Sequence, residues 1–184
     1  MFRINLARGK DQLAIAVYQS GIQAVGRKFF PTKDEVGYIR SASGYNEIEL
    51  GYHRIFQKKE MRFYLAVCYD GFGIINMGVA NPDVDAVLIM AHQFHKPGEG
   101  LSGAVDFARK GFAGVSMHWR CPAFGTAVFF NWKIPEKWPT GVMWDNQGQS
   151  VKAFKYTDNR LSWVSCKIIK GMFETALCSK YFIN

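Results

Sequence analysis

Apolar residues recur at helical spacing near the start of the chain. Within residues 11–26, Ile15, Tyr18, Ile22 and Val25 follow one another at intervals of three, four and three positions. This spacing places their side chains on one face of an α-helix. The pattern predicts an amphipathic helix over residues 11–26, which either packs on a core or lies in a lipid interface.

The ends of this segment carry residues that helices favour. Asp11 lies near the positive end of the expected helix dipole, and Arg27 and Lys28 lie near its negative end. Gly26 is a plausible stop signal. Gly21, in the middle, lowers the helix propensity by about 1 kcal/mol relative to Ala.

From residue 36 onward the pattern changes to short extended runs. Residues 47–50 alternate between polar and apolar, as a half-exposed strand does. Further runs rich in β-forming residues cover 61–69, 73–79, 114–119, 127–134, 151–156 and 163–169. Residues 84–94 fit either a helix or a strand.

We therefore expect one domain over residues 1–184. Its fold is mainly β (α+β): a two-sheet β-sandwich body over 36–184, with the N-terminal amphipathic helix packed on it.

Composition and charge narrow the function classes. The chain has 184 residues, of which 48% are hydrophobic, so it can bury a core. Its 23 basic and 15 acidic residues give a net charge of +8, which favours nucleic acid or an anionic membrane surface as a partner, or simply keeps the protein soluble. No run of about 18 uncharged apolar residues is present, which excludes a membrane-spanning helix. The N-terminus has no signal-peptide pattern, so the protein is cytosolic or a leader has been removed.

The cysteines do not form a metal-binding pattern. Cys68, Cys121, Cys166 and Cys178 contain no CxxC pair, so we expect no structural zinc. Cys68 lies in an apolar run, where a buried inert thiol is the usual case. We expect free thiols.

Histidines and acidic residues offer a second candidate site. His92 and His95, with Asp83 and Asp85, lack the third ligand and the motif of a metal centre. Cys68 could pair with a histidine as nucleophile and base, but the neighbouring sequence offers no oxyanion site. We therefore expect no enzyme, no metal and no cofactor.

Large aromatic side chains gather late in the chain. They are Trp119, Phe124, Phe129, Phe130, Trp132, Trp138 and Trp144. Arg120, Lys133 and Lys137 are interleaved with them, and prolines and glycines interrupt the run. Such a mixture fits a core, a membrane–water interface, or a surface that stacks nucleic-acid bases or sugars.

Short motifs in this half resemble those of the actinoporins, a family of pore-forming cytolysins, and their wider relatives. The motifs are Gly103-Ala104-Val105, Gly114-Val115-Ser116-Met117-His118-Trp119-Arg120-Cys121-Pro122, Asn131-Trp132-Lys133-Ile134 and Lys167-Ile168-Ile169-Lys170-Gly171-Met172. The chain departs from the family pattern at Arg120, where the family has a serine that contacts phosphocholine. Its four cysteines are a further departure.

The resemblance implies a secreted or membrane-associated toxin that docks on lipid and self-associates into a pore. It implies lipid contacts through Trp119, Pro122, Phe124, Phe129, Phe130, Trp132 and Trp138. It also implies that the helix carrying Ile15, Tyr18, Ile22 and Val25 inserts into the membrane.

Two alternatives stay open. The first is a non-enzymatic β-rich protein that recognises nucleic acid, glycan or protein through the same aromatic and basic surface. The second is a small hydrolase that uses Cys68 with His92 or His118, or the pair of His92 and His95.

Overall fold

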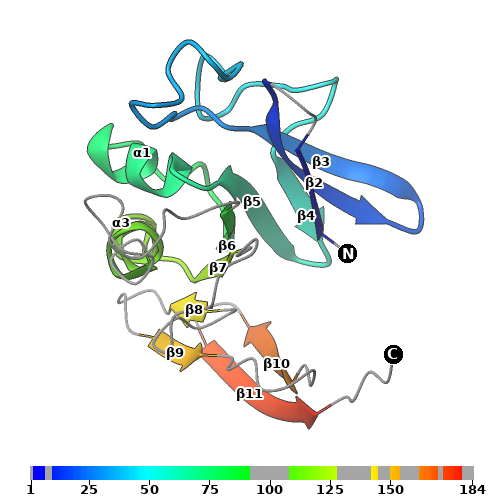
Figure 1. Cartoon of the computed structure of the whole chain (residues 1–184). Coiled ribbons are helices and arrows are strands. Elements are labelled where there is room, and N and C mark those ends of the chain that lie inside the picture. The colour runs from blue at the N-terminus through cyan, green and yellow to red at the C-terminus, as the bar shows by residue number, and fades with distance from the viewer. Residues whose placement is uncertain are drawn as a thin grey trace.

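The computed structural model describes residues 2–6, 10–91, 108–127, 142–144, 150–153, 162–169 and 172–179 (Figure 1). A three-stranded antiparallel sheet consists of β1 (Phe2–Leu6), β2 (Gln12–Tyr18) and β3 (Gly21–Arg27). A six-stranded sheet follows the order β4 (Ile55–Lys58), β5 (Met61–Val67), β6 (Ala86–Ala91), β7 (Ala123–Ala127), β8 (Val142–Trp144) and β9 (Ser150–Ala153). A separate hairpin pairs β10 (Ser162–Ile169) with β11 (Met172–Ser179).

The six-stranded sheet is mixed. Strands β5, β6 and β7 are parallel neighbours, and the other pairs are antiparallel. Parallel neighbours need crossover connections. The first crossover contains helix α1 (Asp70–Asn76), and the second contains the π-helical turn η1 (Ala108–Phe112) and helix α3 (Ala113–Trp119). The nearly continuous apolar sequences of β5 and β6 are typical of parallel strands covered on both faces.

Side chains of β5 alternate between two buried clusters. Tyr64 and Ala66 belong to the cluster that includes residues of α1 and α3, whereas Leu65 and Val67 pack with residues of β2 and β3. This alternation is the period of two that a strand imposes. Strand β5 therefore lies between a helical layer and the β1–β3 sheet, as Figure 1 shows.

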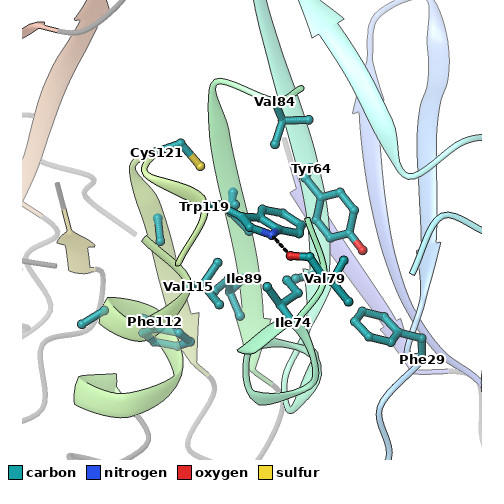
Figure 2. Packing of buried hydrophobic residues seen from close by; sticks show 14 of the residues in the cluster. Phe29, Tyr64, Ile74, Val79, Val84, Ile89, Phe112, Val115, Trp119 and Cys121 are labelled. Carbon is teal, nitrogen blue, oxygen red and sulfur yellow. Dashed lines mark hydrogen bonds between the residues drawn. The ribbon is translucent and has the colours of Figure 1, made fainter. Parts of the chain in front are cut away.

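The helical side of the core is organised around Trp119. Its side chain is 3% exposed, and the indole Nε1 donates to the Val79 carbonyl oxygen at 2.7 Å. The ring meets Tyr64 edge-on, with centroids 4.9 Å apart. Figure 2 shows both rings among the apolar side chains of this cluster. Buried indoles need a partner for their N–H, and Val79 supplies one here.

The predicted N-terminal helix over 11–26 is wrong, because this segment forms the β2–β3 hairpin. Ile15 lies opposite Val25 and Val17 lies opposite Ile22 in the ladder. Gly21 has a φ of 105°, a conformation suited to the turn between the strands and strained for other residues. The branched residues satisfied the helical spacing, but they also favour strands, and pairing with β1 and packing on β5 decided between the two.

Two runs that were predicted as strands lie in the crossovers and are largely helical. Residues 73–79 and 114–119 were expected as strands, but they fall largely in α1 and in α3. Residues 47–50 contribute only an isolated bridge between Glu49 and Tyr52. The strand predicted over 61–69 is confirmed as β5, and the one over 163–169 as β10.

The open choice for residues 84–94 resolves as a strand, since β6 occupies 86–91. The prediction of a β-sandwich with an N-terminal helix is wrong: parallel strands and crossover helices make this an α/β fold. Among the described residues, we find no helix with the length and apolar character needed to cross a membrane.

Candidate active site

Cys68 lies at a sharp turn from a strand into a helix. It follows β5 directly, and only Tyr69 separates it from α1, so residues 68 and 69 form what we call the Cys68 turn. Its φ is 49°, in the left-handed region that few residues other than glycine adopt. Strand-to-helix turns of this kind present nucleophiles in hydrolases, and strained backbone gathers at functional sites.

The turn is also at the edge of the sheet where ligands bind in α/β folds. Cys68 stands at the carboxyl end of β5, next to the parallel strand β6, and α/β sheets bind ligands outside the carboxyl ends of their strands. The Cys68 N–H donates to the Met90 carbonyl oxygen of β6 at 2.8 Å. The side chain is half-buried, so part of it meets the surface.

One carboxylate ties this turn to the end of β3. The Asp70 side chain is completely buried. Its Oδ2 accepts the Val67 N–H at 3.0 Å, and its Oδ1 accepts the N–H groups of Phe29 and Phe30, each at 2.9 Å. Asp70 thereby joins β5, the strand that leads into Cys68, to residues 28–30, which we call the Lys28 segment.

Lys28 is a buried cation at the start of that segment. Its side chain is 1% exposed, and its Nζ donates to the Glu35 carboxylate. Glu35 also accepts the Gln12 Nε2 and the Thr32 N–H, each at 2.8 Å. Burial acts to raise the pKa of Glu35, but the hydrogen bond from Lys28 and the others outweigh it, so the pKa lies below its usual range. Glu35 is therefore a carboxylate at neutral pH.

A second buried cation faces Asp70. The Arg54 guanidinium lies 3.5 Å from Asp70 Oδ2 and donates to the Tyr64 hydroxyl at 3.1 Å and to the Arg27 carbonyl oxygen. It stands over the rings of Phe29 and Tyr64, 5.2 and 5.3 Å from their centroids. Burial raises the pKa of Asp70 to about 6, while Arg54 and the backbone N–H groups oppose that rise. Asp70 is thus ionised at neutral pH.

The second described cysteine has a different environment. Cys121 is 4% exposed and belongs to the core under α3. Burial raises the pKa of its thiol to about 12. Since the thiolate is the reactive form, Cys121 is an inert thiol. The sequence predicted a buried inert thiol at Cys68, but the structure places that side chain only half-buried.

Of the histidines considered as partners of Cys68 or as a pair, His118 lies in the part of the chain that the structure describes. His118 lies on α3, where its Nε2 contacts the Val79 carbonyl oxygen at 2.9 Å. Asp85 accepts the Arg62 N–H at 2.7 Å, and Asp83 pairs with the Arg62 side chain. His92 and His95 lie outside the described residues. In the part of the chain that the structure describes, no cluster of three or more His, Cys, Asp or Glu side chains could hold a metal ion.

Three of the seven residues predicted to meet lipid lie among the described residues, and none of these three is exposed. Trp119 and Pro122 are buried, and Phe124 is half-buried on β7. Phe129, Phe130, Trp132 and Trp138 lie outside the described residues. The residues assigned to the inserting helix lie on strands: Ile15 and Tyr18 on β2, Ile22 and Val25 on β3.

Sequence reasoning missed Lys28, Glu35 and Asp70. The available signal was local: a dense β-forming run ends at Cys68, and Asp70 and two glycines follow at once. A strand that stops at Cys and turns into a glycine-containing helix is the sequence form of a nucleophile turn. Lys28 and Glu35 carry no such signal, because their importance depends on the contacts of β3 with β5.

Comparisons with known proteins give the fold. No protein-family model and no curated protein matches the sequence. A CN-hydrolase superfamily protein from Xanthomonas campestris, solved with an arsenic adduct in its active site, aligns with a TM-score of 0.55 and 13% identity, over 97% of this chain and 61% of that one.

Two further structures are similar. A glutamine-dependent NAD+ synthetase from Acinetobacter baumannii has a TM-score of 0.53 at 12% identity, over 83% of this chain and 28% of that one. A mutant amidase from Nesterenkonia, solved after Michael addition of acrylamide at its active-site cysteine, has a TM-score of 0.51 at 11% identity, over 76% of this chain and 51% of that one. The chain thus spans less than two thirds of each of these structures.

These likenesses overturn three expectations. The fold is a nitrilase-like α/β fold, so the resemblance to actinoporins is wrong. The pore-forming function inferred from it is wrong as well, together with its description as a membrane-binding toxin. The expectation of a non-enzymatic protein is also overturned, because the structural neighbours are carbon–nitrogen hydrolases.

Proposed function

We propose that the chain carries the nucleophile of a hydrolase that cleaves a carbon–nitrogen bond in an amide-type substrate, and that Cys68 is that nucleophile. The observation that carries the proposal is the left-handed backbone of Cys68 at the carboxyl end of a parallel strand, directly before a helix. Such a conformation costs about 1–3 kcal/mol and persists only where the surrounding structure holds it, as the hydrogen bond to Met90 of β6 does at Cys68.

The chemistry follows that of other thiol nucleophiles. The Cys68 sulfur attacks the carbonyl carbon, and a carbon–sulfur bond forms as the carbon–nitrogen bond breaks. The thiol proton passes to a base and from there to the departing nitrogen. Water then hydrolyses the thioester, which releases the acid and restores the thiol. Each step needs positive charge or N–H donors near the oxygen that becomes negative.

Lys28 is the proposed source of that positive charge. It is fully buried, and it begins the segment that Asp70 holds against the Cys68 turn. An ammonium group in a site of low dielectric stabilises a thiolate and an oxyanion more strongly than it does in water. The ion pair with Glu35 holds the Lys28 side chain in place.

The fold neighbours support the reaction class. They include CN-hydrolases, and one of them is an amidase with an active-site cysteine. Cysteine chemistry on this type of fold therefore agrees with the position of Cys68.

The test compares two cysteine variants. Ammonia release from acetamide, propionamide and glutamine is measured for the native chain, Cys68→Ala and Cys121→Ala. We expect Cys68→Ala to lower the rate at least about 1,000-fold, as loss of a nucleophile does. Cys121→Ala is the matched control, and we expect its rate to stay within about twofold because this buried thiol takes no part.

Alkylation supplies a second readout. Iodoacetamide labelling followed by peptide mass mapping reports each cysteine separately. We expect Cys68 to react much faster than Cys121. Hydrolysis that survives Cys68→Ala, or a native chain that hydrolyses none of the amides, would contradict the proposed function.

A further inference from the structure

We propose that Asp70 is the positioning residue of this site: its carboxylate fixes the Cys68 turn and the Lys28 segment in one geometry. This inference rests on the proposed function of Cys68. Asp70 itself is no catalytic residue, because its oxygens are occupied by backbone N–H groups and by Arg54.

The hydrogen bonds that Asp70 accepts link the two segments directly. Oδ2 reaches back to the N–H of Val67, the residue before Cys68, at 3.0 Å. Oδ1 reaches across to two consecutive N–H groups of the Lys28 segment at 2.9 Å each. The two segments are about 40 residues apart in sequence, since Phe29 and Asp70 are separated by 41 positions. A shift of one segment therefore breaks bonds to the other.

The Asp70 carboxylate is itself held in place by its surroundings. Asp70 is completely buried, and Arg54 lies 3.5 Å from its Oδ2 with a side chain that is 1% exposed. Arg54 is fixed in turn by Tyr64, by the Arg27 carbonyl oxygen and by the Phe29 ring. Hydrogen bonds to a charged acceptor are stronger than neutral ones, and no bulk water competes at full burial.

The chain is closely packed on both sides of the Asp70 contacts. A Cβ added at Gly73 in α1 would lie 2.5 Å from the Phe30 Cβ. A Cβ added at Gly26 in β3 would lie 3.0 Å from the Leu65 carbonyl oxygen of β5. Backbones this close leave little room to slide, so the bonds of Asp70 select one register between the Cys68 turn and the Lys28 segment.

The test separates geometry from charge with two variants. Asp70→Glu keeps the charge but adds a methylene, which moves the carboxylate by about 1.5 Å. Asp70→Asn keeps the shape but places an NH2 donor against the Val67 N–H. The second-order rate of iodoacetamide alkylation at Cys68 is measured from pH 5 to pH 10 by peptide mapping. The charged group that faces Asp70 is the Arg54 guanidinium. The titratable hydroxyl of Tyr64 accepts a hydrogen bond from that guanidinium.

A positioning role gives the same direction in both variants. We expect alkylation of Cys68 at pH 7 to fall at least about tenfold and its pH midpoint to rise, because the Lys28 segment no longer lies in register with the thiol. Amide hydrolysis should fall about 100-fold, as it does when reacting groups are displaced by an ångström. If Asp70 acted only as a nearby negative charge, Asp70→Asn would lower the midpoint and Asp70→Glu would leave it unchanged. That result would overturn the inference.

Asp83→Asn is the matched control. It makes the same chemical change at an exposed carboxylate with a φ of 58°, where asparagine is well tolerated. We expect its alkylation and hydrolysis rates to stay within about twofold of the native values.

The outcome for Asp70 is distinguishable from that for the proposed function. A native chain that alkylates selectively at Cys68 but hydrolyses no amide would refute the function, while the alkylation series would still decide the role of Asp70. Unchanged alkylation in both Asp70 variants would refute the positioning role alone.

A measurement on the native chain covers the case in which both variants unfold. Hydrogen exchange of the Val67, Phe29 and Phe30 amides should show one common opening free energy, because a single carboxylate binds all three. Opening of Val67 separately from Phe29 and Phe30 would overturn the inference.

Discussion

Three basic side chains in the first third of the chain are directed inward. Arg27, Lys28 and Arg54 are 6%, 0% and 1% exposed, and each faces a carboxylate. These three cations are therefore not available to attract a polyanion, and the excess positive charge of the chain lies on other residues. Buried cations keep their charge only when they are paired, which makes Asp11, Glu35, Glu49 and Asp70 structural requirements.

The Lys28–Glu35 pair gives a prediction at this scale. Glu35→Gln should lower the free energy of unfolding at pH 7 by about 2 kcal/mol, because it leaves a buried ammonium without its counter-charge; this value allows for the partial exposure of Glu35. The folded-state pKa of Glu35 lies below its ordinary 4.5, so its stabilisation is complete above about pH 4.5 and is lost as the pH falls further.

Urea unfolding at pH 7, 5 and 3.5 measures this effect. The difference between the native chain and Glu35→Gln should be full at pH 7 and 5 and should shrink at pH 3.5. Glu60→Gln, at an exposed turn residue, is the control and should change the stability by less than about 0.5 kcal/mol. A difference that is constant with pH would contradict the role of the ion pair.

At the scale of elements, the crossover helices are fitted to the sheet at glycines. A Cβ at Gly125 in β7 would lie 2.2 Å from the ring of Phe112, which is completely buried at the junction of η1 and α3. A Cβ at Gly114 would lie 2.5 Å from the Ile75 side chain. Gly125 lets the Phe112 ring approach the sheet, and Gly114 lets α3 approach α1.

Gly125→Ala should therefore destabilise the fold by about 1–3 kcal/mol, since the Phe112 ring has no free volume into which to move. Thermal or urea unfolding measures the loss. Gly44→Ala is the matched control, because a Cβ there meets nothing within 4 Å and its φ is not in the left-handed region. Equal stability of the two variants would contradict the packing argument.

At the scale of the molecule, β5 is the central element of the described core. Its two faces belong to two different buried clusters, and it pairs with β4 on one side and β6 on the other. The candidate site is built where this strand ends, so a strand buried on both faces supports a residue with left-handed backbone.

Hydrogen exchange of the native chain tests this arrangement. The amides of β5 and β6 should exchange only through global unfolding, because both strands are paired on two sides and covered on two faces. Residues of the turn between β2 and β3 should exchange through local opening with a lower free energy. Faster exchange in β5 than in this turn would show that the core lies elsewhere.

The sequence by itself determined strands at two places along the chain. The run over 61–69 has a continuous β-forming pattern and became β5, and the run over 163–169 became β10. It also determined that a core would form. It did not determine the structure of residues 11–26, because Ile15, Ile22 and Val25 fit the spacing of a helix face but are β-branched residues that also favour strands.

Only the tertiary structure decided the crossovers and the candidate site. Residues 73–79 and 114–119 are largely helical because parallel neighbours β5, β6 and β7 require connections that return across the sheet. Trp119 is buried because α3 faces this core. The site depends on contacts between Lys28 and Glu35, and between Asp70 and the Lys28 segment. No local pattern encodes those contacts, since they exist only after β3 has packed against β5.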